Sequence, residues 1–334
     1  MISTRRPVRR AAASLDKRCC MALDPEIKAM LDRLAAEQAS SQQEVTLQSA
    51  RRDYRAQYRE MSRAPEGDVS EATVRLPGGH ADASLRIYTP ADLSGSAPVI
   101  LYLHGGGFVL GDADTYALQS ARIALECGAV VAFLEYRLAP EHPFPAALED
   151  TLLAVNWIAG NAASIAGDAG RFMLMGDSAG ANLSIAAMLQ DRAPFKGACL
   201  LYLLVDARPY LGLASKSASD EAFATGHYLE FAETEYFARA YLPDHALASD
   251  PRVSPVLAAD LSGLPPILFY GAENDILRDQ GSAFAEQLKA AGNNVKYRCF
   301  DGLIHNFMQH SGISKRSDAA FLEVCGAVKQ MLAA

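Results

Sequence analysis

Short apolar runs alternate with helix-forming stretches over most of the chain, and this alternation restricts the fold more than any other feature. The apolar runs are rich in β-branched and aromatic residues, as strands are: APVILYLHGGGF, AVVAFLEYR, RFMLMG, GACLLYLLV, PPILFYGAEND and NVKYRCF. Helices are expected between these runs, near residues 113–126, 145–160, 179–190 and 281–291. Buried strands that alternate with helices predict a mostly parallel central sheet flanked by helices, which is an α/β fold.

Two segments fall outside this alternation. Residues 22–65 have helical periodicity, with a first helix capped by Asp24 and a second helix over Thr46–Met61. Residues 206–245 are a long interval between two strand runs, and such an interval indicates an insertion above the sheet. Since no internal repeat or low-complexity linker divides the chain, we expect a single domain over 21–334 that carries both segments as a helical cap.

The first twenty residues differ in composition from the rest of the chain. MISTRRPVRRAAASLDKRCC contains six Arg or Lys and one Asp, and it lacks the apolar region of a secretory signal. A disordered basic tail over 1–20, or an upstream start codon, is favoured over a targeting sequence.

The composition argues against several classes of protein. The 334 residues are 50% hydrophobic, which is enough for a sizeable core, and their net charge is −8. This charge argues against nucleic acid or an anionic membrane as the main partner. No apolar run approaches the 18 residues of a transmembrane helix. The six cysteines include no Cys-x-x-Cys pair, which favours buried reduced thiols and a cytoplasmic location.

One strand leads directly into GDSAG at residues 176–180, and a helix-forming run follows. A strand, Gly-x-Ser-x-Gly and a helix together form the nucleophile elbow of hydrolases. Glycine two positions either side of Ser178 avoids clashes in the sharp turn. The helix N-terminus beneath the serine favours developing negative charge. The segment therefore predicts Ser178 as a nucleophile.

A serine hydroxyl needs a general base, and four histidines follow the elbow. His227 and His245 lie in the inserted segment. His305 lies in a loop directly after the strand-like NVKYRCF, where a side chain can reach the nucleophile. His310 is five residues further on and is expected to be a surface histidine within or beside the next helix.

The acid that orients the base is expected after the strand in PPILFYGAEND. Three carboxylates follow or end this strand, namely those of Glu273, Asp275 and Asp279. Asp279 is expected to be helical. Spacing alone leaves Asp275 only modestly ahead of Glu273.

A glycine-rich loop, YLHGGGFVLGD, ends another strand and offers backbone N–H groups for an oxyanion hole, together with the N–H of Ala179. Nucleotide-binding motifs do not fit the same loop. Gly-x-Gly-x-x-Gly fails because Leu110 occupies its last position counted from Gly105, and a phosphate-binding loop fails because Asp112 follows Gly111 where lysine is required.

Taken together, these motifs resemble those of the hormone-sensitive-lipase family of α/β-hydrolases, especially its bacterial carboxylesterases and acetyl esterases. The resemblance covers about residues 70–334, and the N-terminal helices fit the family's cap. Five motifs occur in the family's order: HGGGF at 104–108, YRLAPE at 136–141, GDSAG at 176–180, DILRD at 275–279, and His305.

The resemblance implies Ser178 as the nucleophile, Asp275 as the orienting acid and His305 as the general base. It is this resemblance that places Asp275 above Glu273. The implied reaction is hydrolysis of short- to medium-chain acyl esters by a carboxylesterase. This reaction requires no metal or cofactor, and its substrate is a small-molecule ester. Whether the protein forms a homo-oligomer stays open.

The resemblance also implies that Gly105, Gly106 and Ala179 donate the oxyanion N–H groups and that His104 holds the glycine loop. One departure from the family pattern is Asn306, where members usually have Gly or Ala. Two rival functions stay open on the same fold: an amidase or acyltransferase that uses the same triad, and a non-catalytic ligand receptor. The receptor is disfavoured because all three triad positions are filled.

Overall fold

The computed structural model describes residues 22–40, 45–78, 80, 83–191 and 195–334. The basic tail expected at 1–20 lies outside these residues. Within them, one sheet has the strand order β1-β2-β4-β3-β5-β6-β7-β8, and the strands from β4 to β8 in this order are parallel. The strands are β1 (Val69–Arg75), β2 (Ser84–Pro90), β3 (Ala97–Leu103), β4 (Val130–Glu135), β5 (Gly167–Asp177), β6 (Gly197–Leu201), β7 (Ile267–Asn274) and β8 (Val295–Ile304).

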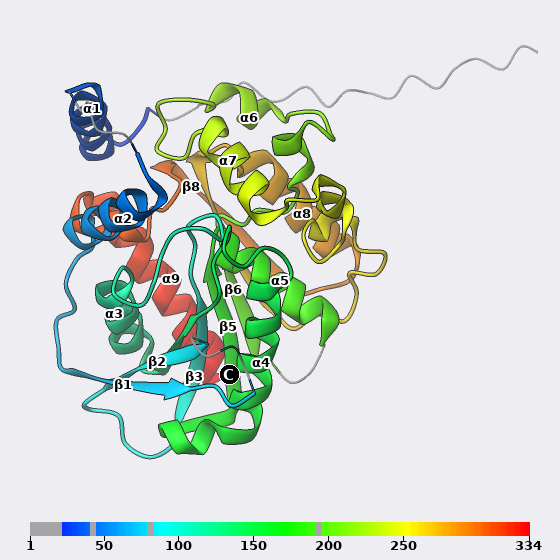
Figure 1. Ribbon diagram of the computed structural model, residues 1–334. Helices are drawn as coiled ribbons and strands as arrows, with labels where there is room; N and C mark the ends of the chain where they lie inside the picture. Colours follow the sequence, from blue (N-terminus) through cyan, green and yellow to red (C-terminus); the bar gives the residue numbers. More distant parts are fainter. Residues whose placement is uncertain (1–21, 41–44, 79, 81–82, 192–194) are drawn as a thin grey trace, which may run out of the picture.

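Helices cover both faces of this sheet, which confirms the predicted α/β-hydrolase architecture (Figure 1). One face is covered by α3 (Ala117–Cys127) and α9 (Lys315–Ala333), and the other by α4 (Ala146–Asn161), α5 (Ala179–Gln190) and α8 (Arg278–Ala290). The helix expected from residue 113 begins only at Ala117, because Asp112 Oδ1 accepts both the N–H and the hydroxyl of Thr115 in a preceding turn.

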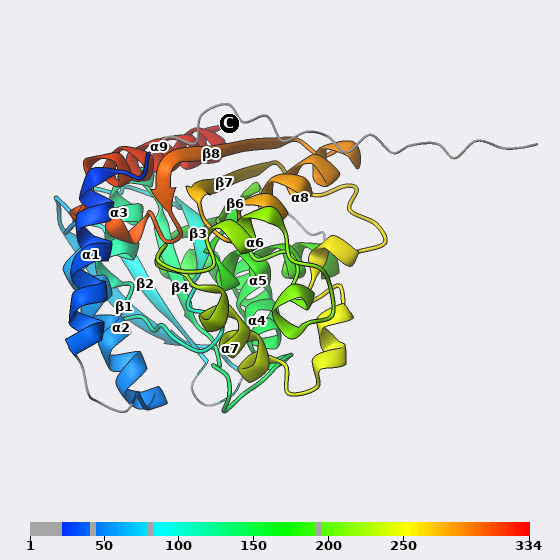
Figure 2. The same cartoon turned by 90° about the horizontal axis from the view of Figure 1, so that it is seen from above.

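Four further helices lie above the carboxyl ends of the parallel strands (Figures 1 and 2). They are α1 (Pro25–Ser40) and α2 (Leu47–Met61), followed by α6 (Ala218–Ala222) and α7 (Phe231–Tyr241). Asp24 caps α1 as expected, since its Oδ1 accepts the N–H groups of Glu26 and Ile27 at 3.1 Å. Its own N–H donates to Gly302 O at 3.0 Å, which ties the start of α1 to β8.

Short 3-10 helices complete the connections: η1 (Ala162–Ile165), η2 (Arg208–Leu211), η3 (His245–Ser249), η4 (Pro255–Leu257) and η5 (Gln309–Gly312). Three of these, η2 to η4, lie in the long connection between β6 and β7, which also contains α6 and α7. In the described part of the chain, no helix combines the length and the apolar character needed to cross a membrane.

Candidate active site

Ser178 stands at the junction of β5 and α5, in the sharp turn that the sequence predicts. Its φ of 53° and ψ of −115° lie in a region that residues with side chains rarely adopt. The chain packs so closely around this turn that a Cβ on Gly180 would lie 1.8 Å from Leu103 O, and a Cβ on Gly176 would lie 2.5 Å from the Gly180 carbonyl. Glycine at both positions is therefore a steric requirement of the turn.

Three residues separated widely in the sequence meet at this turn. His305 follows the end of β8 and Asp275 follows the end of β7, so the parallel sheet brings both to the edge where Ser178 lies. His305 Nε2 is 3.0 Å from Ser178 Oγ, and His305 Nδ1 is 2.8 Å from Asp275 Oδ2. All three side chains are buried. Such an arrangement can pass the serine proton to an oriented imidazole.

The two other carboxylates considered from the sequence have different contacts. Glu273 lies within β7, and its Oε2 accepts the Gly302 N–H at 2.7 Å. Asp279 lies in the first turn of α8, where its Oδ2 accepts the Ser219 N–H at 2.9 Å. Of these three carboxylates, Asp275 is the one that contacts His305. Sequence spacing alone could not distinguish it from the other two.

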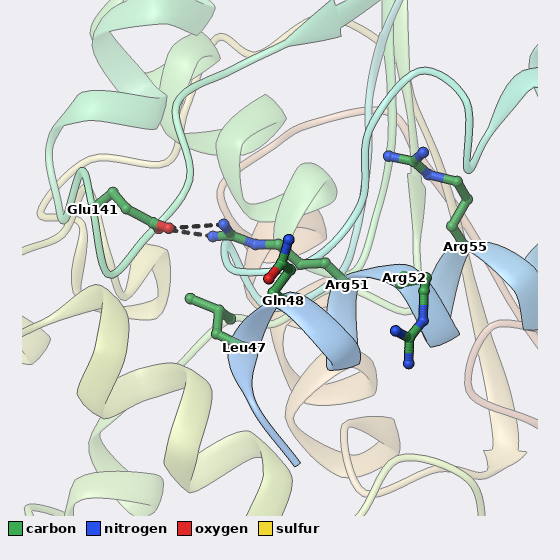
Figure 3. A pocket seen from close by; sticks show the side chains of 6 residues that line it. All are labelled: Leu47, Gln48, Arg51, Arg52, Arg55 and Glu141. Carbon is green, nitrogen blue, oxygen red and sulfur yellow. Dashed lines mark hydrogen bonds and ion pairs between the residues drawn. The ribbon is translucent and has the colours of Figure 1, made fainter. Parts of the chain in front are cut away.

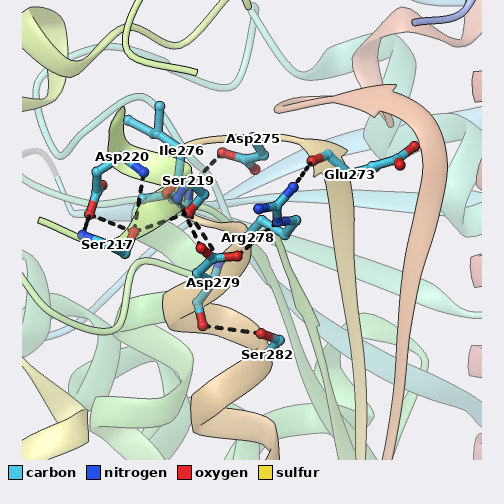
Figure 4. A network of polar contacts seen from close by, with 10 residues as sticks. Ser217, Ser219, Asp220, Glu273, Asp275, Ile276, Arg278, Asp279 and Ser282 are labelled. Carbon is cyan, nitrogen blue, oxygen red and sulfur yellow. Dashed lines mark hydrogen bonds and ion pairs between the residues drawn. The ribbon is translucent and has the colours of Figure 1, made fainter. Parts of the chain in front are cut away.

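Ser219, which belongs to the insertion 206–245, hydrogen-bonds to the segment that follows Asp275 (Figure 4). Its hydroxyl donates to Ile276 O at 2.8 Å, and its N–H donates to Asp279. Ser219 is fully buried at the start of α6. The insertion thus contacts the main chain immediately after Asp275, a contact that no local sequence pattern predicts.

The glycine loop after β3 offers fewer free N–H groups than its sequence suggests. The Gly105 N–H already donates to Asp177 Oδ1 at 3.0 Å and to the Tyr116 hydroxyl at 3.1 Å. It therefore points into the fold, which leaves Gly105 without a free N–H for an oxyanion. In the described residues, no acceptor is seen for the N–H groups of Gly106, Gly107 or Ala179.

His104 holds this loop from within the fold. Its Nδ1 is 2.7 Å from Gly105 O, and its ring stacks on that of Tyr136 with centroids 4.1 Å apart. Burial lowers the pKa of His104 to about 4, so the ring is neutral at physiological pH. These contacts are those of a structural residue and offer no base to a substrate.

Helix α2 contacts the same loop through Arg51. Its Nε donates to Val109 O at 2.9 Å, one Nη donates to Ala139 O at 3.0 Å, and both Nη groups bind Glu141 at 2.8 Å (Figure 3). Arg51 is therefore turned toward the body of the protein, unlike the exposed Arg52. A surface hollow of about 530 Å³ lies beside Arg51, and its lining is Leu47, Gln48, Arg51, Arg52, Arg55 and Glu141. Ser178, Asp275 and His305 do not line this hollow.

His310 is not a surface histidine, and the expectation from the sequence is wrong. The turn after His305 folds inward as η5, so the His310 ring is fully buried and meets Tyr228 edge-on at 4.8 Å. Burial lowers the pKa of His310 to about 3. The apolar residues Phe307 and Met308, just before His310, were the sequence feature that could have indicated a buried turn.

Two further residues lie beside His305; Tyr202 was not found from the sequence, whereas Asn306 was noted there as a departure from the family pattern. Tyr202 follows β6, meets the His305 ring edge-on at 4.7 Å, and donates its hydroxyl to Gln309 Oε1 at 3.0 Å. Asn306 has a φ of 63°, in the left-handed region where glycine is the usual residue and asparagine is tolerated. This conformation would suit glycine, and asparagine can adopt it at lower cost than most other residues.

A family model described as the alpha/beta hydrolase fold matches residues 100–309. The chain belongs to the α/β-hydrolase family. Within this family it is similar to the carboxylic ester hydrolase LipN of Mycobacterium tuberculosis, at 34% identity over 80% of this chain and 72% of that protein. It is also similar to an ethyl acetate hydrolase of Pseudomonas putida, at 31% identity over 93% of this chain and all of that protein.

Solved structures of α/β-hydrolases agree over nearly the whole chain. An ester hydrolase named EH1AB1, from the metagenome of Lake Arreo, superposes with a TM-score of 0.86 at 31% identity, over 94% of this chain and all of that one. The hyperthermophilic esterase of Pyrobaculum calidifontis has a TM-score of 0.84 at 33% identity, over the same shares of the two chains. These likenesses confirm the expected place of the chain in the hormone-sensitive-lipase group of esterases.

Proposed function

We propose that this protein is a serine carboxylesterase in which Ser178, His305 and Asp275 form the catalytic triad. The observation that carries the proposal is the position of His305, whose two ring nitrogens contact Ser178 Oγ and Asp275 Oδ2. The enzyme class, a carboxylic ester hydrolase, is that of the named relatives of this α/β-hydrolase. The triad and its roles are what the proposal adds.

The proposed reaction proceeds in two halves through an acyl-enzyme. His305 Nε2 takes the proton of Ser178 as Oγ attacks the ester carbonyl, and Asp275 keeps the ring oriented and stabilises its charged form. His305 then protonates the leaving alcohol. Water repeats the sequence, giving its proton to His305 and releasing the acid and free Ser178. These steps use no metal or cofactor.

The oxyanion is assigned to three N–H groups that have no acceptor in the described residues, those of Gly106, Gly107 and Ala179. Gly105 is left out because its N–H is bound to Asp177 and Tyr116. The N-terminus of α5 at Ala179 adds a favourable dipole for negative charge. Each such donor contributes about 3–4 kcal/mol to lowering the barrier.

A short- to medium-chain acyl group is supported by the aromatic side chains above the glycine loop. Phe237 of α7 lies so close to Gly107 that a Cβ there would be 2.2 Å from its ring. Phe108 stacks on Tyr241 with ring centroids 3.8 Å apart. We propose that 22–65 and 206–245 form the cap and that these aromatic residues close the acyl side of the site.

The triad is tested by single substitutions in the full chain. Ser178→Ala should lower kcat by several orders of magnitude with the fold retained, because the change removes only the attacking oxygen. Asp275→Asn should also be severe, since it favours the wrong tautomer of His305. Glu273→Gln is the matched control and should be mild. Near-normal rates in folded Ser178→Ala would refute the nucleophile, and a harsher Glu273→Gln would identify a different acid.

The substrate class is tested with nitrophenyl esters from C2 to C16 and an anilide. Each added methylene gains about 0.8 kcal/mol while it is buried, so kcat/KM should rise to about butyrate or hexanoate and then fall. A maximum at C12 or longer would indicate a lipase-like site. Equal turnover of the anilide would favour an amidase on the same triad.

A further inference from the structure

A buried carboxylate lies directly before the proposed nucleophile, and the mechanism above does not use it. Asp177 is fully buried. Its two oxygens accept hydrogen bonds from four groups: the Tyr102 hydroxyl at 2.8 Å, Gly105 N–H at 3.0 Å, the Tyr116 hydroxyl at 3.1 Å and Gln309 Nε2 at 3.4 Å. Burying a charge is costly unless such donors compensate for the lost water, so this carboxylate needs a reason to be there.

The four donors come from different parts of the active site. Gly105 begins the glycine loop, and Gln309 belongs to the turn that follows His305. A Cβ on Gly105 would lie 2.5 Å from Asp177 Oδ2, so glycine at this position lets the carboxylate pack against the loop. Asp177 therefore joins the elbow, the glycine loop and the histidine segment at one point.

Helix α2 reaches this carboxylate through Tyr116. The Tyr116 hydroxyl donates to Asp177 and accepts the Gly105 N–H, and its oxygen is 3.4 Å from the hydroxyl oxygens of both Tyr54 and Tyr58 of α2. Tyr54 in turn donates to Tyr58 at 2.6 Å. The rings also pack, with centroids 5.1 Å apart for Tyr58 and Tyr116. A hydroxyl cluster thus connects α2 to the base of the elbow.

We propose that Tyr116 and Tyr58 are positioning residues that act through Asp177. They hold the glycine loop and the elbow in the relative placement that the tetrahedral intermediate requires. The inference rests on the proposed function and deepens it. Oxyanion donors act only over about 2.7–3.1 Å, so a small displacement of the loop affects the intermediate more than the bound ester. Helix α2 is then part of the framework of the site as well as its cover.

The test removes single oxygens and leaves the rings in place. Tyr116→Phe should lower kcat about tenfold, and Tyr58→Phe about threefold, which is the range expected for one hydrogen bond. KM for nitrophenyl acetate should stay within about twofold, because neither hydroxyl is assigned a contact with the substrate. Tyr88→Phe is the matched control: it is buried, and its hydroxyl donates to Ala113 O, away from Asp177.

A second readout separates positioning from a loss of packing. A boronic acid forms a tetrahedral anionic adduct with an active serine, so its Ki should rise in parallel with the fall in kcat in both tyrosine variants. In a double-mutant cycle, Tyr58→Phe should have little further effect in the Tyr116→Phe protein, because Tyr58 acts through Tyr116. Melting temperatures of all variants are measured alongside.

Two results would overturn the inference. One is an unchanged kcat and boronate Ki in Tyr116→Phe. The other is additive effects of the two substitutions, which would mean that Tyr58 does not act through Tyr116. Ser178→Ala is assayed in parallel: activity in that variant would refute the proposed function, whereas its inactivity beside unchanged tyrosine variants refutes this inference alone.

Discussion

The two segments above the sheet, 22–65 and 206–245, both contact the glycine loop after β3, but by different means. The first contacts the glycine loop through polar groups, with Arg51 on the Val109 carbonyl and the tyrosines of α2 near Tyr116. The second places Phe237 against the glycine loop by packing and holds the acid segment through Ser219.

This difference shows that an amphipathic sequence pattern does not reveal whether a helix is fixed to the protein by hydrogen bonds or by apolar packing. Few side chains of α2 are fully buried, yet its polar groups contact main-chain atoms of the site directly. Directional hydrogen bonds fix position more narrowly than apolar contact does, since they weaken steeply when misaligned. We therefore expect substitutions on the two segments to differ in kind. Of the four measurements below, the first concerns Asp177, which α2 reaches through Tyr116, and the other three compare the two segments directly.

The largest expected effect concerns Asp177 and pH. Burial raises its pKa from 3.8 to about 6, against the hydrogen bonds from Tyr102 and Tyr116 that lower it. Between pH 3.8 and about 6, the Asp177 carboxyl binds more protons in the folded state than in the unfolded state. The Asp177 carboxyl therefore stabilises the fold at low pH. Its contribution is lost as pH rises through about 6, by about 3 kcal/mol in total.

The measurement compares the free energy of unfolding of the wild type and Asp177→Asn from pH 3.5 to 7.5. The wild type should lose stability relative to the variant as pH rises. Buried His104 and His310 act with the opposite sign, because their pKa values are lowered, but both are present in each protein and cancel. A difference that does not vary with pH would contradict the prediction.

Arg51→Ala should give the next largest effect, on the side of the N-terminal segment. It removes the donors of two main-chain carbonyls, those of Val109 and Ala139, as well as the pair with Glu141. The free energy of unfolding should fall by about 2 kcal/mol, as for hydrogen bonds to charged groups. Arg52→Ala, at an exposed position on the same helix, should change it by less than about 0.5 kcal/mol. Equal effects in urea unfolding would erase the distinction between the two arginines.

Ser219→Ala tests the other side of the comparison. It leaves the Ile276 carbonyl without its buried donor, at a cost of about 1–2 kcal/mol. Since Ile276 follows Asp275, kcat should fall along with stability. Ser215→Ala, at an exposed position in the same insertion, is the control. If kcat is unchanged while stability falls, Ser219 holds the insertion but does not position Asp275.

The smallest effect is expected on the outer face of α7. Arg239 and Glu235 form an exposed pair one turn apart, with Arg239 Nη2 2.8 Å from Glu235 Oε1. Such pairs contribute about 0.3–0.5 kcal/mol. Arg239→Ala should therefore lower stability by no more than this and leave kcat/KM unchanged. A larger loss of stability would show that this exposed ion pair contributes more to the free energy of unfolding than surface pairs usually do.

Much of the fold could be predicted because its signals are local. Strand runs, helix caps such as Asp24, and the elbow around Ser178 depend on neighbours a few residues apart. Predictions failed where distant segments meet. His310 is buried because η5 packs against α2 and the ring of Tyr228, and the Gly105 N–H is taken by a carboxylate 72 residues away in the sequence.

By itself, the sequence determined the α/β architecture, the elbow and the order of the three residues that meet there. These depend on steric limits and periodicity, which each short stretch carries within itself. Only the tertiary structure decided that Asp275 rather than Glu273 contacts His305, and that α2 reaches Asp177 through Tyr116. Such contacts join side chains far apart in the chain, and their distances follow from how helices and strands pack, which no local pattern contains.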